Sequence, residues 1–153
     1  MKSVINYSIL FLVLFPVLLF SETNSYKKNA IILGVLTGGG SLVGLEYERM
    51  IYGPLGITIG GGIIGIGAQV NLHFKPSVTS SGVSLVWWNQ GIPGNTASQQ
   101  ILGLCFTARL WKWVHASLGF GYAYWQGAKM AAALKNTKFM LLYNIGVSFC
   151  FGK

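Results

Sequence analysis

The sequence contains very little negative charge. Its 153 residues include three acidic residues against 11 Lys and Arg, which gives a formal net charge of +8 at neutral pH. Charged residues of either sign make up only 9% of the chain, whereas roughly a quarter is usual in soluble domains. The chain therefore lacks the charged surface that an ordinary soluble domain presents to water.

Cysteine and histidine are also rare, with two of each. Cys105 and Cys150 are far apart and no metal-ligand spacing surrounds them, so the sequence indicates neither a disulfide framework nor a metal site. Whether the two cysteines are free thiols or paired stays open, because an exported protein can form a disulfide. The glycine runs at 38–40 and 60–62 lack the flanking residues of phosphate-binding loops. We therefore predict no cofactor.

The N-terminus has the layout of a secretory signal peptide. Lys2 precedes an apolar run over residues 4–20, and small polar residues follow it. We predict a signal peptide over residues 1–25 and a single domain over residues 26–153; an uncleaved membrane anchor is the alternative. Removing this segment takes away one lysine and one glutamate, so the net charge of +8 is unchanged. Export, and the absence of an arginine-rich run or nucleic-acid motif, argue against a nucleic-acid partner.

Alternation between apolar and polar side chains dominates the rest of the chain, which is 52% hydrophobic overall. The segment 66–75 is the clearest case: Ile, Ala, Val, Leu and Phe share one face, and Gly, Gln, Asn, His and Lys share the other. A period of two residues is typical of a β-strand rather than a helix.

Similar segments predict about eight antiparallel strands, with connections that alternate between two ends. The strands are expected over residues 30–37, 41–51, 55–63, 66–75, 82–88, 100–111, 114–125 and 139–151. One end is expected to hold the connections at 52–54, 76–81 and 112–113. The other is expected to hold a tight glycine turn at 38–40, a reversal at 64–65 and the longer loops at 89–99 and 126–138. Short turns at one end and longer loops at the other are typical of outer-membrane barrels.

A membrane would require the sheet to close, because hydrocarbon cannot satisfy the backbone groups of an open edge. We therefore predict an all-β fold, a single closed antiparallel up-and-down transmembrane β-barrel of about eight strands. Its apolar face would point to lipid, and its polar face would fill an interior just wide enough for side chains. The polar residues expected to point inward are Glu46, Glu48, Gln69, Asn71, His73, Thr107, Arg109, His115, Ser117, Asn144 and Ser148.

The only two acids after the predicted signal peptide, Glu46 and Glu48, fall on this inward face, as does Arg109. An unpaired buried charge is costly, so we predict a buried ion-pair cluster of these three residues, with His73 as a possible member. An ion path lined by the cluster is the functional alternative.

Aromatic residues concentrate near predicted strand ends, as expected for two interfacial girdles. These are Tyr47, Tyr52, Trp87, Trp88, Trp111, Trp113, Tyr124 and Trp125. Two other folds remain open: a soluble β-sandwich with ordinary aromatic packing, and a helical membrane protein with a span over residues 55–70. The many glycines of that window disfavour a helix.

The layout resembles small bacterial outer-membrane β-barrel proteins over roughly residues 30–152. The resemblance is carried by residues 44–49 and the turn and alternating strand after them, and by the closing strand 143–151, which ends in Phe151 followed by Gly152 and Lys153. It implies an integral outer-membrane location after export, contact with outer-membrane lipid, and recognition of the last strand by the outer-membrane insertion machinery.

One short segment, His115-Ala116-Ser117, resembles the His-x-Ser pair of lipid A deacylase barrels, in which a serine nucleophile and a histidine base act with a glutamate. The residues that follow are Leu-Gly-Phe, and no acid follows Glu48 in the chain. We therefore predict that the protein is not an enzyme, and that His115 and Ser117 are polar residues of the interior.

The function expected from these patterns is that of a monomeric barrel with a filled interior and a structural or loop-mediated binding role. A narrow pore is the alternative. The binding candidates on the second long loop are Lys129, Lys135 and Lys138, which would suit an anionic glycolipid or another extracellular ligand.

Overall fold

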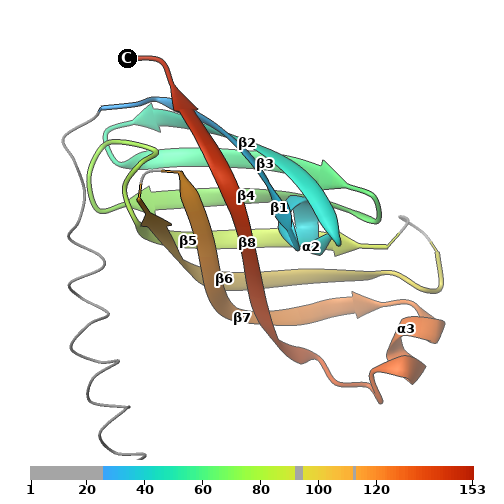
Figure 1. The fold of residues 1–153 in the computed structure, drawn as a ribbon. Coiled ribbons are helices and arrows are strands. Elements are labelled where there is room, and N and C mark those ends of the chain that lie inside the picture. The colour runs from blue at the N-terminus through green and yellow to red at the C-terminus, as the bar shows by residue number, and fades with distance from the viewer. Residues whose placement is uncertain (1–25, 92–94, 112) are drawn as a thin grey trace, which may run out of the picture.

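A computed structural model describes residues 26–91, 95–111 and 113–153. In these residues eight antiparallel strands form a closed barrel in which each strand pairs with the next and the last pairs with the first (Figure 1). The strands are β1 (Asn29–Val35), β2 (Val43–Tyr52), β3 (Leu55–Gly62), β4 (Gly65–His73), β5 (Gly82–Gln90), β6 (Gln99–Leu110), β7 (Val114–Gln126) and β8 (Phe139–Phe151). The predicted closed antiparallel barrel is confirmed, with strand ends shifted by a residue or two.

Two of the alternative folds are wrong. Residues 55–70, the proposed helical span, form β3 and most of β4, and one closed ring replaces the two sheets of a sandwich. Among the described residues, no helix has the length and apolar character needed to cross a membrane. The predicted signal peptide lies outside the described residues.

The alternation of the sequence decides which side chains point into the barrel. On β2, Gly44, Glu46 and Glu48 are buried whereas Leu45 and Tyr47 are exposed. The pattern repeats around the ring: polar side chains fill the interior, and large apolar side chains such as Leu104 (66% exposed) and Phe120 (75% exposed) cover the outside. The barrel is thus apolar outside and polar inside, as its alternation predicted.

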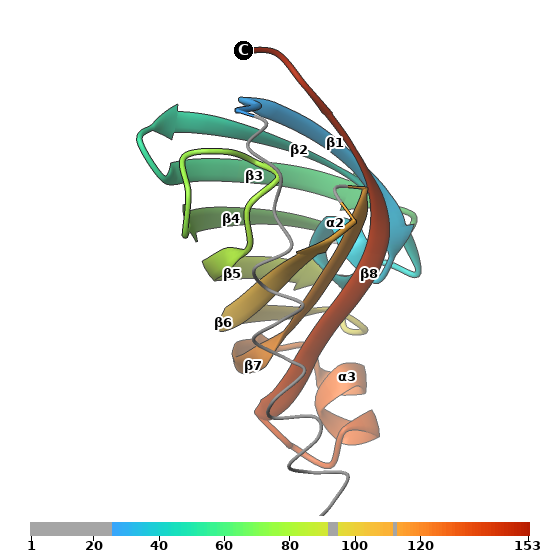
Figure 2. The same cartoon turned by 60° about the vertical axis from the view of Figure 1, so that its left-hand side comes forward.

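Consecutive antiparallel strands place their connections at alternate ends of the barrel (Figures 1 and 2). The loop end carries the connections 36–42, 63–64, 91–98 and 127–138. The terminal end carries 53–54, 74–81 and 111–113, together with the start of β1 and the end of β8. A short helix, α3 (Ala128–Ala133), lies in the last connection of the loop end.

The connection after β1 is not the tight external turn that the sequence predicted. Residues 37–40 form α2 (Thr37–Gly40), which is fully buried and contacts β1 to β5 and β8 from inside the ring (Figure 2). Positive φ angles at Leu36 and at Gly38 to Gly40 turn the chain inward, and glycine adopts them without steric cost. A Cβ at Gly39 would lie 2.0 Å from the carbonyl oxygen of Ile66, so only glycine permits this close approach.

The connection 74–81 covers the opposite end of the interior. Its residues 77–81 are buried, and Val78 packs in an apolar cluster with Ala30 and Met50. A second apolar cluster lies toward the loop end and comprises Val86, Trp88, Ile101, Cys105, Ala123 and Leu142. Apolar clusters therefore lie at both ends of the interior, beside buried polar residues such as Thr79 at the terminal end and Asn89 and Gln99 at the loop end.

Candidate functional site

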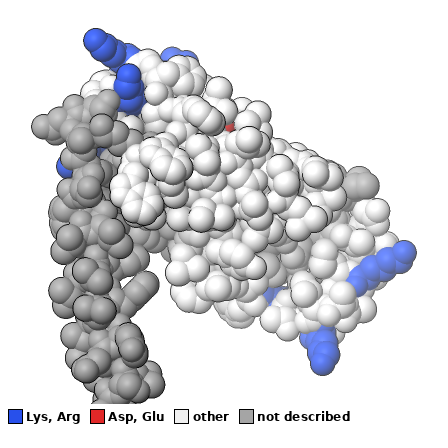
Figure 3. Space-filling model, in the orientation of Figure 1, with Lys and Arg blue, Asp and Glu red and all other residues white. Residues whose placement is uncertain are grey.

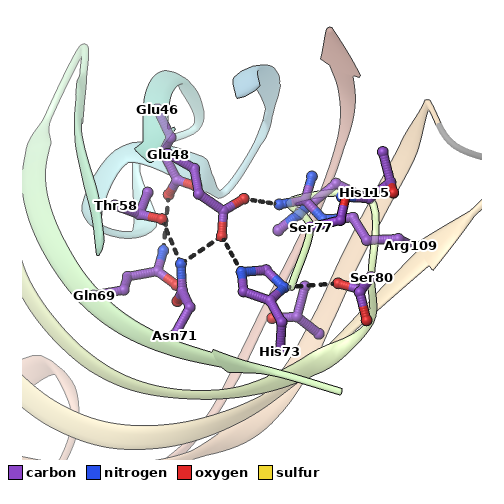
Figure 4. A network of polar contacts seen from close by, with 12 residues as sticks. Glu46, Glu48, Thr58, Gln69, Asn71, His73, Ser77, Ser80, Arg109 and His115 are labelled. Carbon is purple, nitrogen blue, oxygen red and sulfur yellow. Dashed lines mark hydrogen bonds and ion pairs between the residues drawn. The ribbon is translucent and has the colours of Figure 1, made fainter. Parts of the chain in front are cut away.

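Glu48 is the centre of a buried polar network in the middle of the barrel (Figure 4). Its Oε1 accepts hydrogen bonds from Asn71 Nδ2 at 2.6 Å and from His73 Nε2 at 2.9 Å. Its Oε2 forms an ion pair with Arg109 Nη2. All four side chains are at least nine-tenths buried, so the network is shielded from solvent.

The pairing of the strands explains how these residues meet. β2, β3 and β4 are neighbours, and the alternation points Glu48, Thr58 and Asn71 to the same side; Asn71 Nδ2 also donates to Thr58 Oγ1 at 2.7 Å. Arg109 is different, because it lies on β6, 61 residues from Glu48 in sequence. It reaches the carboxylate across the interior only because the sheet closes.

His73 links the network to the terminal end. Its Nδ1 contacts the carbonyl oxygen of Ser80 at 2.9 Å, in the connection that covers this end, and its Nε2 contacts Glu48. His73 therefore joins Glu48 on β2 to the connection that covers the terminal end.

Glu46 does not join the ion pairs of the described residues, which corrects the predicted three-residue cluster. Its Oε1 instead accepts a hydrogen bond from the backbone N–H of Gly38 at 2.8 Å, and another from Gln69 Nε2 at 3.3 Å. The sequence missed this contact because α2 was expected outside the barrel. Glu46 thus fastens α2 to the barrel wall, whereas Glu48 joins opposite sides of the interior.

His115 and Ser117 lie on the inner face of β7. Ser117 Oγ is 3.1 Å from His115 Nε2 and 3.0 Å from Thr107 Oγ1, and all three side chains are buried. Among the described residues, no carboxylate forms a hydrogen bond with the His115 ring, which instead interacts with Asn144. The pair therefore lacks both the orienting acid and the accessible surface that a serine hydrolase needs.

The charged groups outside the barrel are cationic. The three candidate lysines are exposed at the loop end, with Lys129 on α3 and Lys135 and Lys138 after it. Lys138 Nζ lies 5.9 Å from the centre of the Tyr122 ring. In the described parts of the chain both acids are buried, and in Figure 3 the blue cationic side chains gather at opposite ends of the face shown, with white residues and one small red spot between them.

Most of the predicted girdle aromatics lie on the outside. Trp87, Tyr124 and Trp125 are near the loop end, where Trp87 Nε1 donates to Tyr124 Oη at 2.9 Å; Tyr52, Trp111 and Trp113 are near the terminal end. Trp88 is an exception. It is 2% exposed and points inward, because it is the next residue after Trp87 and successive strand residues face opposite sides.

The remaining reactive side chains form no further site in the described residues. Neither Cys105 nor Cys150 forms a disulfide in the described residues, which answers the question of pairing that the sequence left open. Across residues 26–91, 95–111 and 113–153, no group of three His, Cys, Asp or Glu side chains has the arrangement of a metal site.

The chain matches no protein-family model, no curated protein and no solved structure. Its function is therefore inferred from its own residues.

Proposed function

We propose that the protein is an integral outer-membrane β-barrel with a side-chain-filled interior and a structural or loop-mediated binding role. One observation carries this proposal: the barrel is apolar outside and polar inside. In water such an exterior would expose a continuous apolar surface far larger than soluble monomers tolerate. In a bilayer the same surface is solvated by lipid, and barrel closure pairs most of the backbone.

The two ends of the barrel support a membrane-spanning orientation. Exposed tryptophan and tyrosine side chains lie toward both ends, as in interfacial girdles. Cations flank the apolar band on both sides, where they would meet anionic lipid headgroups. At the terminal end these are Lys27, Lys28, Arg49, Lys75 and Lys153.

The outer membrane fits better than other membranes because β-barrels with short turns at one end and longer loops at the other are typical of it. In this proposal residues 1–25 direct export, the insertion machinery recognises the last strand, and the terminal end faces the periplasm. The protein acts as a monomer, since each strand pairs with two neighbouring strands of the same chain. The outward loop end then presents Lys129, Lys135 and Lys138 to an anionic glycolipid or an extracellular ligand.

Membrane fractionation with a heat-modifiable gel shift tests the location. We expect the protein in the outer-membrane fraction, and faster migration of the unheated than of the boiled sample, because a folded barrel resists detergent unfolding. Recovery in the soluble fraction, with identical migration before and after boiling, would refute the proposal.

A narrow pore is the competing function, and planar-bilayer conductance separates the two. Figure 4 shows the polar network that bridges the interior, and the buried residues of α2 and Val78 occupy its two ends. We expect no stepwise conductance from the purified protein. Reproducible single-channel steps would favour the pore.

Lipid deacylation is the competing activity, given the contact between His115 and Ser117. Both side chains point inward, away from the lipid surface where a deacylase must meet its substrate. We expect no deacylase activity in the wild-type protein and none in Ser117→Ala. An activity that Ser117→Ala abolishes, while its heat-modifiable migration is retained, would establish the enzyme instead.

A further inference from the structure

The wall of the barrel has a gap beside β8 at the loop end. β1 ends at Val35, which pairs with Ile145, so residues 139–144 of β8 have no partner strand on that side. On their other side the same residues are paired with β7, from Tyr122–Phe139 to Ser117–Asn144. The cause is α2: the chain that would have extended β1 turns into the interior instead.

A pocket of about 210 Å³ occupies this gap. Its lining includes Met140 and Leu142, which point inward, and Leu141 and Tyr143, which point outward. The pocket is lined by both inward-facing and outward-facing residues of β8. It therefore runs past the edge of this strand and connects the outer surface with the interior. The other lining residues are Leu36, Gly40, Trp88 and Gln90.

The inner wall of the pocket contains a hydrogen-bond donor. Trp88 is 2% exposed, and its Nε1 has no hydrogen-bond partner among the described residues. Gln90 is already engaged, since it accepts from Gln99 Nε2 at 2.6 Å and its own Nε2 approaches the Gly40 carbonyl at 3.4 Å. An unpaired buried donor costs free energy, so an oxygen acceptor on a ligand would stabilise the site.

These features select the chemistry of the ligand. Six of the eight lining residues carry apolar or aromatic side chains and polar groups complete the lining, which suits an amphiphile with an alkyl chain. The volume suits one chain rather than a two-chain lipid. The N–H of Trp88 requires an acceptor at the inner end of the ligand. No Lys or Arg side chain lines the pocket among the described residues, so an uncharged oxygen suits its inner end better than an ionised group.

We propose that this gap is a lateral binding site for a free long-chain fatty acid, which enters from the bilayer between β8 and α2. The carbonyl oxygen of its neutral carboxyl group accepts the hydrogen bond of Trp88 Nε1, and its chain runs past Met140 and Leu142 to the outer surface. This inference rests on the proposed membrane location, because the outer mouth of the pocket must face hydrocarbon.

Quenching of Trp88 fluorescence by a brominated fatty acid tests the site. The full chain is used with its other four tryptophans replaced, as Trp87→Phe, Trp111→Phe, Trp113→Phe and Trp125→Phe, and is refolded into phospholipid vesicles. Trp88 lies at the inner wall of the pocket, so lipids that stay on the outer surface of the barrel do not touch it. We expect saturable quenching by the fatty acid, and binding weaker by about fivefold or more for a brominated alkane of equal length, which lacks the acceptor.

Two variants locate the binding. Met140→Phe, which narrows the pocket, is expected to abolish the saturable quenching. Leu104→Phe adds the same ring to the outer surface of β6 and is expected to leave the saturable quenching unchanged.

Four results would overturn the inference: no quenching by the fatty acid, equal quenching by the alkane, equal quenching by vesicles of brominated phospholipid, or no effect of Met140→Phe. Heat-modifiable migration is measured on every sample. Its loss would indicate failure of folding or of the membrane proposal, whereas intact migration without quenching would refute the fatty-acid site alone.

Discussion

Replacement of Glu48 by glutamine tests whether the ion pair across the interior stabilises the barrel. Glu48→Gln keeps the shape of the side chain and its Oε1, which still accepts from Asn71 and His73. It removes the negative charge from beside Arg109. The Nε and Nη1 atoms of Arg109 already lack a hydrogen-bond partner among the described residues, so its guanidinium would lose its one direct counter-charge.

The expected cost follows from this isolation. Unit charges roughly 4 Å apart interact by about 4 kcal/mol at an effective dielectric constant near 20. Removing one member of a buried pair typically costs about 3–5 kcal/mol, because the other charge stays buried and uncompensated. We therefore expect Glu48→Gln to lower the free energy of unfolding by about 3–5 kcal/mol.

Urea unfolding of the vesicle-inserted barrel, followed by tryptophan fluorescence, provides the measurement. Arg109→Met and the double variant complete a thermodynamic cycle. The double variant buries no unpaired member of this ion pair, so it should cost less than the two single changes together, with a coupling of about 2–3 kcal/mol. Thr107→Val is the control, because it removes one neutral buried hydrogen bond at a cost of about 1 kcal/mol.

Two results would refute this reasoning. A loss below about 1 kcal/mol in Glu48→Gln, matching the neutral control, would mean that Arg109 finds equivalent compensation elsewhere. Costs that simply add in the double variant would mean that Glu48 and Arg109 do not interact.

Three further predictions concern α2 and the loop lysines. Gly39→Ala should cost about 2–5 kcal/mol in the same assay, from its left-handed backbone and the contact with Ile66; Gly53→Ala, also at positive φ but with open space around it, should cost about 1 kcal/mol, and equal losses would contradict a packed α2. Glu46→Gln should weaken the bond to Gly38 by about 1–2 kcal/mol and increase hydrogen exchange of the Gly38 amide, and unchanged exchange would count against this anchor. Replacing the three loop lysines Lys129, Lys135 and Lys138 together by glutamine should reduce binding to lipopolysaccharide-containing vesicles at low salt. Binding to vesicles of neutral lipid should not change. Unchanged binding to the lipopolysaccharide-containing vesicles would exclude the loop as the glycolipid site.

The barrel itself was predictable because alternation is a local property of the sequence. In a strand, residues two positions apart lie on the same face. The inward positions of Glu48, Asn71 and Arg109 therefore followed from counting along each strand. Closure into a ring followed from the apolar outer face, which has no core to cover it. The same logic should have placed Trp88 inside, since Trp87 and Trp88 cannot both face out of one regular strand.

What lies inside the barrel depended on contacts that no local pattern encodes. The glycines at 38–40 fit a tight hairpin turn equally well, and only the glycine-rich wall of β3 and β4 gives α2 room to enter. That inward fold directs Glu46 to the Gly38 amide instead of Arg109, and it leaves β8 without a partner over residues 139–144.

The sequence by itself therefore determined the strands, their two faces and the closed ring, because each follows from a two-residue period and the need to pair backbone groups. The tertiary structure alone decided which charges meet, how both ends are covered and where the wall opens. These depend on register and close packing between segments far apart in the chain, as the sequence separation of 61 positions from Glu48 to Arg109 illustrates.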